Sequence, residues 1–105
     1  MTKYGSKKSV ASDGRVFPSG RERKRYEELL LLQRIGEIND LVCQHKWTLI
    51  PKQEGEREVT YTSDFDYIDR DGKYHVEDTK GVRTQQYVIR RKLMLWVHHI
   101  KIEEL

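Results

Sequence analysis

The feature that most constrains the fold of this chain is an Asp71-Gly72 dipeptide between two runs rich in β-branched and aromatic residues. Asp-Gly in such a setting is among the strongest short-range signals for a β-hairpin. The sequence therefore predicts paired antiparallel strands over residues 57–68 and 73–80. This pairing would bring acidic residues of the first strand beside acidic residues and a lysine of the second.

Side-chain alternation divides the second predicted strand into two faces. Asp78 and Lys80 share a face with the apolar Val76. We expect this face to pack against the rest of the domain, and Glu77 to point away from it. A buried carboxylate and lysine are costly unless something pairs them, and a bound cation or a substrate phosphate would do so. A plain Asp-Lys ion pair at the sheet edge is the structural alternative.

Length and composition predict one small domain with a single core. The chain has 105 residues, of which 36% are hydrophobic and 35% charged. No run approaches the roughly 20 apolar residues of a membrane span, and no apolar signal-peptide core is present, so a cytoplasmic location is expected. The single cysteine, Cys43, excludes an internal disulfide framework. The small core favours help from a partner subunit, which makes a homodimer an expected assembly.

Positive charge is concentrated near the N-terminus. The net charge is +3, and eight of the first 25 residues are basic while two are acidic. We expect residues 1–18 to form a basic, partly flexible arm and residues 19–105 to form the domain. Clustered lysines and arginines favour a polyanion such as nucleic acid. A disordered solubilising tail is the alternative.

Helix-start signals precede both apolar periodic segments. Ser19 and Glu22 fit a capping box, which predicts a helix from Ser19 to about Ile38. Glu22 also lies on the inward stripe of this helix, so it is either a capping residue or an inward carboxylate. The other predicted elements are a strand over 47–50, a helix capped by Thr84 and a strand over 100–105. The order helix-strand-strand-strand-helix-strand indicates an α/β (α+β) fold with a mixed central sheet flanked by helices.

Several short motifs occur in a fixed order along nearly the whole chain. They are Lys3-Tyr4-Gly5-Ser6-Lys7-Lys8, Ser19-Gly20-Arg21-Glu22, Gln44, Ser63-Asp64-Phe65, Glu77-Asp78-Thr79-Lys80-Gly81 and Thr84. In this order they resemble the PD-(D/E)XK nuclease superfamily and, within it, a phage-encoded family of short proteins of unknown function. They also resemble transposon end-cleaving nucleases. The resemblance implies a small restriction-endonuclease-like core, and Ser63 departs from the proline that often stands at its position.

The resemblance also implies which residues form the catalytic site. Asp64 and Asp78 match the two metal-binding carboxylates, and Lys80 matches the lysine of the motif. Strand alternation agrees with Asp78, but it leaves Asp64 and Asp66 as alternatives about 7 Å apart on one face. Only the resemblance selects Asp64.

Two further matches extend this implied site. Glu22 matches the acidic residue of the first helix, and Gln44 matches a glutamine that precedes the first site strand. Asp64, Asp78, Glu22 and the carbonyl of Thr79 would hold Mg2+, with Mn2+ as a substitute. Lys80 would orient the attacking water or stabilise charge on the phosphate. Gln44 would position the water or a phosphate.

The implied activity is metal-dependent hydrolysis of DNA, in a phage protein acting in its bacterial host. No sequence-reading module is recognisable, which favours selection of branched DNA by shape, in the manner of junction resolvases. The expected DNA-contacting residues are Lys7, Lys8, Arg21, Arg83, Arg90, Arg91 and Lys92. The alternatives are a non-catalytic nucleic-acid-binding or protein-interaction module that keeps the fold, and a small basic RNA-binding protein. The absence of an exposed aromatic strand motif argues against the last.

Overall fold

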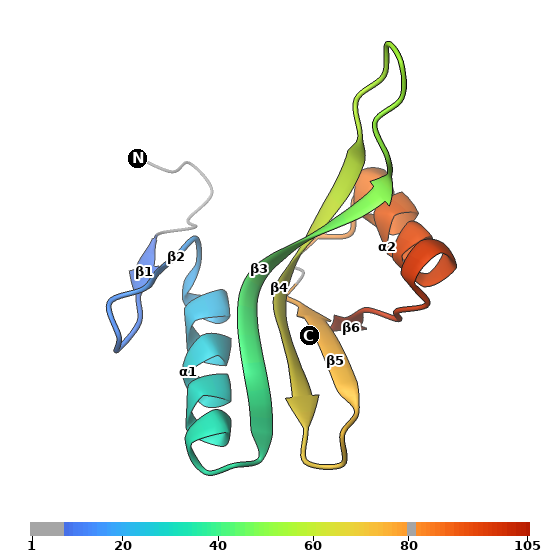
Figure 1. The fold of residues 1–105 in the computed structure, drawn as a ribbon. Coiled ribbons are helices and arrows are strands. Elements are labelled where there is room, and N and C mark those ends of the chain that lie inside the picture. The colour runs from blue at the N-terminus through green and yellow to red at the C-terminus, as the bar shows by residue number, and fades with distance from the viewer. Residues whose placement is uncertain (1–7, 80–81) are drawn as a thin grey trace.

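The computed structural model describes residues 8–79 and 82–105, which contain two helices, a four-stranded mixed sheet and a small two-stranded sheet (Figure 1). The elements are β1 (Ser9–Val10), β2 (Val16–Phe17), α1 (Gly20–Arg34), β3 (Ile38–Ile50), β4 (Val59–Asp69), β5 (Tyr74–Asp78), α2 (Gln85–His98) and β6 (Glu103–Glu104). The larger sheet has the order β3-β4-β5-β6, and only its β5–β6 pair is parallel. From α1 onward, the predicted order of helices and strands is confirmed.

Both helices begin where their capping residues predict. Ser19 Oγ accepts a hydrogen bond from the backbone N of Glu22 at 3.2 Å, and Thr84 Oγ1 accepts one from the backbone N of Tyr87 at 3.1 Å. Helix α1 ends at Arg34, earlier than predicted. Gly36 follows with φ of +81°, a left-handed conformation that terminates helices. Neither described helix is long and apolar enough to cross a membrane.

Strand β3 is much longer than the predicted strand over 47–50. It begins at Ile38 and continues through the polar residues Asn39 and Asp40, which are uncommon in strands. The register with β4 shifts between Asn39 and Val42, and Asp40 has φ of +58°. These features describe a β-bulge, which accommodates an extra residue without ending the strand. Asn39 and Asp40 therefore lie at a bulge inside one continuous strand.

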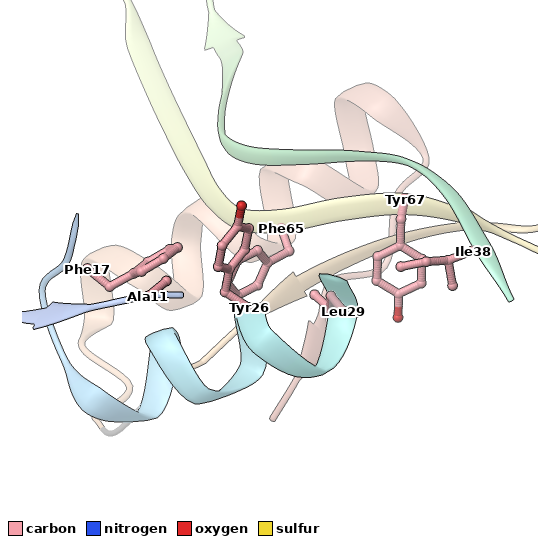
Figure 2. Close-up of a cluster of buried hydrophobic side chains, with 7 residues drawn as sticks. All are labelled: Ala11, Phe17, Tyr26, Leu29, Ile38, Phe65 and Tyr67. Carbon is pink, nitrogen blue, oxygen red and sulfur yellow. The ribbon is translucent and has the colours of Figure 1, made fainter. Parts of the chain in front are cut away.

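Two separate hydrophobic clusters hold the helices on the sheet. The first joins α1 and the β1–β2 hairpin to one half of the long β3–β4 hairpin, and its buried residues are Ala11, Phe17, Tyr26, Leu29, Ile38, Phe65 and Tyr67 (Figure 2). The second joins α2 to the other half, and its buried residues are Leu49, Tyr61, Tyr87, Met94 and Ile102. The strongly twisted β3–β4 hairpin thus provides a packing surface for each helix (Figure 1).

The described part of the predicted N-terminal arm packs on the domain. Residues 9–17 form the β1–β2 hairpin, and its Ala11 and Phe17 are buried in the first cluster. Ser12 Oγ also donates a hydrogen bond to Glu27 of α1 at 2.7 Å. A boundary at residue 18 would therefore separate buried residues from their own core.

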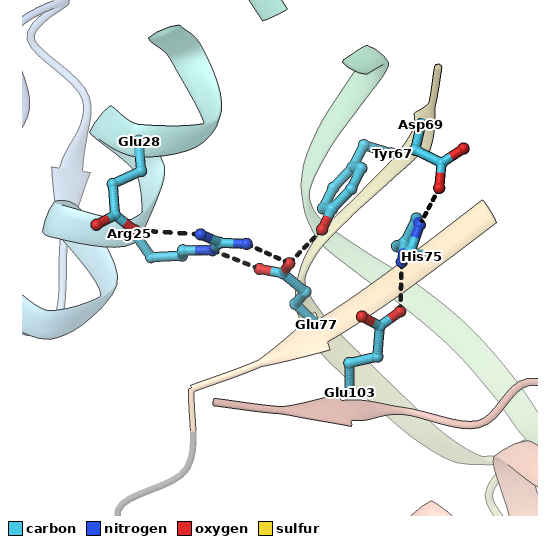
Figure 3. Close-up of polar contacts among 7 residues, drawn as sticks. All are labelled: Arg25, Glu28, Tyr67, Asp69, His75, Glu77 and Glu103. Atoms are coloured by element: carbon cyan, nitrogen blue, oxygen red, sulfur yellow. Dashed lines mark hydrogen bonds and ion pairs between the residues drawn. The ribbon is translucent and has the colours of Figure 1, made fainter. Parts of the chain in front are cut away.

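The short strand β6 is tied to the sheet by a histidine between two carboxylates. His75 Nε2 lies 2.7 Å from Asp69 Oδ2, and His75 Nδ1 lies 2.6 Å from Glu103 Oε2 (Figure 3). Burial lowers the pKa of His75, but the two carboxylates outweigh burial and raise this pKa above its ordinary value of about 6.5. Because the folded-state pKa lies above the unfolded value, the stabilisation of the fold by these two contacts is present below about pH 6.5. It is lost as pH rises through the folded-state pKa.

We expect the free energy of unfolding of the wild type to exceed that of His75→Gln by more at pH 5.5 than at pH 8. The ring of His75 carries the positive charge that pairs with Asp69 and Glu103 only while it is protonated. Urea unfolding at both pH values measures this difference, and an NMR titration of His75 measures its pKa. A His75 pKa at or below about 6.5 would contradict the prediction.

Candidate active site

Strand register brings three of the predicted site residues to one level of the sheet. The pairing of β3 with β4 includes Cys43 with Phe65 and His45 with Ser63, which places Gln44 at the level of Asp64. The pairing of β4 with β5 includes Phe65 with Glu77, and its next step sets Asp64 opposite Asp78. Residues opposite each other on antiparallel strands have Cβ atoms about 4.5–5.5 Å apart. Three neighbouring strands therefore each contribute one polar residue at the same level of the sheet, and we call these three residues the row.

Asp64 and Asp78 are each held by hydrogen bonds at the end of β5. The backbone N and Oγ1 of Thr79 donate to Asp64 Oδ2 at 2.7 and 2.8 Å. Asp78 is only 2% exposed and accepts a hydrogen bond from the hydroxyl of Tyr61. Burial, followed by the contact with Asp78, raises the pKa of Tyr61, so this hydroxyl stays protonated as a donor. The ring of Tyr61 in turn packs 6.4 Å from that of Tyr87 in α2.

Gln44 connects the row to helix α1. Its Nε2 donates a hydrogen bond to Glu22 Oε2 at 2.9 Å. Glu22 is 5% exposed, so its backbone N–H takes part in the cap while its carboxylate points inward. Gln44 has φ of +56° in the middle of β3, which is uncommon for a residue other than glycine. Such backbone outliers cluster at functional sites.

The two aspartates left as alternatives by strand alternation have different surroundings. Asp66 is 2% exposed, accepts a hydrogen bond from the hydroxyl of Tyr74 at 2.6 Å and contacts His45 Nδ1. Asp64 is half-buried and stands level with Asp78. The structure therefore encloses Asp66 in a polar cluster and leaves Asp64 in the row. The His45–Asp66 contact could not be predicted, because no local sequence pattern joins these two residues.

Glu77 is buried, which corrects the expectation that it points away from the domain. It is 1% exposed and accepts hydrogen bonds from Arg25 Nε at 2.8 Å, from Arg25 Nη2 at 2.6 Å and from the hydroxyl of Tyr67 (Figure 3). The alternation itself holds, since Glu77 contacts α1 while Asp78 contacts Tyr61 beside α2. The error was to expect one buried face of β5, whereas Glu77 on the opposite face is buried against α1.

Two predicted residues, Lys80 and Lys7, lie outside the described residues. The other predicted DNA-contacting residues fall into two groups. Those with exposed side chains and no ion pair to Glu104 are Lys8, Arg21 and Lys92. Arg83 and Arg91 both pair with Glu104, at 3.0 and 3.3 Å, and Arg90 Nε donates to a carbonyl of β4 at 2.9 Å. The contact with Arg83 and further hydrogen bonds lower the pKa of Glu104 to about 2.

The oxygen donors of the row suit a hard divalent cation. Over residues 8–79 and 82–105, no three or more His, Cys, Asp or Glu side chains are grouped so that they could hold a metal ion. Glu22, Asp64 and Asp78 therefore do not form a cage of three carboxylates. Mg2+ needs no such cage, because it is usually bound by one or two carboxylates together with waters and substrate phosphates. Asp64, Asp78 and the carbonyl of Thr79 provide a donor set of that kind.

A family model described as "Protein of unknown function (DUF1064)" matches residues 1–103. The chain belongs to this family. Comparison with curated proteins and with solved structures gives no match. The DUF1064 match spans every residue of the row, so the candidate site lies inside the family's boundaries. Since the family description assigns no activity, the function has to be argued from the site itself.

Proposed function

We propose that the protein is a metal-dependent endonuclease that hydrolyses DNA phosphodiester bonds. The observation that carries this proposal is the row of Gln44, Asp64 and Asp78 across three neighbouring strands, with Glu22 joined to it through Gln44. The order of helices and strands also agrees with the restriction-endonuclease-like core that the sequence resemblance implied. Phage origin, action in the bacterial cytoplasm and membership of the PD-(D/E)XK superfamily are parts of the proposal that rest on that resemblance.

Asp64, Asp78 and the carbonyl of Thr79 are the groups that would hold the metal. Bound there, Mg2+ or Mn2+ would supply charge neutralisation at the phosphate and a lower pKa for a bound water. Thr79 fixes the Asp64 carboxylate by two hydrogen bonds to Oδ2. Within the described residues, Asp64 Oδ1 accepts no hydrogen bond, so we assign this oxygen the role of metal ligand.

The remaining groups of the row orient water and substrate. Because Gln44 Nε2 donates to Glu22, its carbonyl oxygen is the atom available to accept a hydrogen bond from a water. Tyr61 keeps the buried Asp78 carboxylate in one orientation. Lys80 is the group proposed to stabilise negative charge on the phosphate. Hydrolysis consumes one water for each phosphodiester and leaves a phosphate monoester and a hydroxyl.

The alternative function is a non-catalytic module that binds nucleic acid or protein and keeps the nuclease fold. One observation favours it, namely that the described carboxylates form no group of three. The two functions differ in one measurable respect, because only the enzyme converts its substrate.

Purified protein should cut DNA when Mg2+ or Mn2+ is added. Labelled duplex, four-way junction and single-stranded DNA are incubated with either ion, and products are resolved on a denaturing gel. We expect cleavage of at least one substrate, with the junction preferred, and none when EDTA replaces the metal. Cleavage that persists in EDTA would exclude the metal-dependent mechanism. If no substrate is cut with either ion, the non-catalytic module is the better description.

A further inference from the structure

A groove lined by basic side chains runs beside β5. It is lined by Lys73, Tyr74, Val76, Arg83 and residues 99–104. We propose that this groove binds the sugar-phosphate backbone of the DNA strand that leads into the row of Gln44, Asp64 and Asp78. The inference rests on the proposed function and adds to it the path of the substrate.

The positive charge of the groove is not cancelled by its two acidic residues. Glu103 is paired with His75 at 2.6 Å, and Glu104 is paired with Arg83 at 3.0 Å. By contrast, the side chains of Lys73 and Lys101 form no ion pair with any described residue. Two lysines without a partner in one groove form a site for a polyanion, because phosphate oxygens would supply the missing negative charge.

Strand β5 links the groove to the candidate active site. Tyr74, Val76 and Asp78 alternate along β5, so their side chains lie on one face of the strand. The first two line the groove, and the third belongs to the row. Lys73 precedes β5 and Arg83 follows it, so the basic side chains extend over the whole strand. Four residue steps of a strand span about 13 Å. That length corresponds to about four nucleotides of B-form DNA at about 3.4 Å each.

The backbone of His99 adds a second observation on the groove wall. This residue caps the C-terminus of α2 with φ of +59°, a position where glycine is usual. A histidine there places an imidazole in the groove lining instead of leaving the position without a side chain. An imidazole N–H is a donor to phosphate oxygens, as are the ammonium groups of the two lysines.

The test reverses the charge of the two unpaired lysines. The variant Lys73→Glu/Lys101→Glu is compared with Lys46→Glu/Lys52→Glu, which changes the net charge equally on exposed lysines outside the groove. Binding of a fluorescein-labelled 20-base-pair duplex is measured by anisotropy in EDTA over a range of salt concentrations. Each lost phosphate contact should reduce the slope of log K against log salt by about 0.9. For the groove variant alone, we expect the slope to fall by about 1.8 and the binding to weaken at least about tenfold.

Equal salt slopes for the two double variants would overturn the proposal. If poly-L-glutamate binds the wild type more tightly than the duplex at equal charge concentration, the occupant is an acidic protein segment and the proposal also fails. Circular dichroism checks folding, and Lys73→Gln/Lys101→Gln replaces any charge-reversed variant that does not fold. Cleavage without groove-dependent binding would reject the groove and retain the nuclease. Groove-dependent binding without cleavage would retain the groove and reject the nuclease.

Discussion

Asp78→Asn is expected to abolish DNA cleavage while leaving the fold and most DNA binding intact. Asparagine keeps the shape of the side chain and an oxygen that accepts the hydrogen bond of Tyr61. It removes the negative charge that a hard divalent cation requires. A loss of about 4 kcal/mol in transition-state stabilisation corresponds to a rate about 10³-fold slower. Single-turnover cleavage in Mg2+ measures the rate, and anisotropy in EDTA measures binding.

A matched pair of variants on β4 tests the site more sharply. Asp64→Asn should lose activity as Asp78→Asn does, because both carboxylates belong to the row. Asp66→Asn changes the same strand face about 7 Å away. We expect it to lower stability by disturbing the contacts with His45 and Tyr74, but to retain cleavage. Retained activity in Asp64→Asn together with lost activity in Asp66→Asn would reverse the assignment.

Arg25→Met should lower the free energy of unfolding by about 3–5 kcal/mol, since it leaves the Glu77 carboxylate buried without its cation. Glu77 is 1% exposed, and both of its oxygens accept hydrogen bonds from the Arg25 guanidinium. The hydroxyl of Tyr67 is a neutral donor and cannot replace that charge. Urea unfolding followed by circular dichroism measures the change.

Two further variants separate burial from charge in this result. Arg25→Met/Glu77→Leu removes both charges, and we expect it to recover much of the lost stability, because a buried ion pair replaced by apolar groups is often neutral. Arg70→Met breaks an exposed ion pair with Glu37, so its effect should stay within about 1 kcal/mol. A loss below about 1 kcal/mol for Arg25→Met would show that water reaches Glu77 and that the pair is not an essential contact.

Structural features that depend on only a few neighbouring residues were predicted from the sequence. Ser19 and Thr84 cap their helices because a capping hydrogen bond joins residues three positions apart. The Asp71-Gly72 turn forms because Gly72 adopts φ of +83°, which glycine tolerates best. The hairpin then determines the pairing of β4 with β5 and sets Asp64 opposite Asp78. The predicted helix ends and strand lengths were less accurate. The length of β3, for example, depends on a bulge at Asp40 that forms against the partner strand.

The sequence by itself determined the hairpin and the helix starts, and its resemblance to a nuclease superfamily proposed the residues of the candidate site. Only the tertiary structure decided which of these residues meet and which are enclosed. Glu77 is buried against Arg25 of helix α1, which lies 52 positions earlier in the chain. Asp66 differs from Asp64 through His45 and Tyr74, which come from two other strands. Local patterns record the alternation of a strand, but the burial of each face depends on how distant elements pack against it.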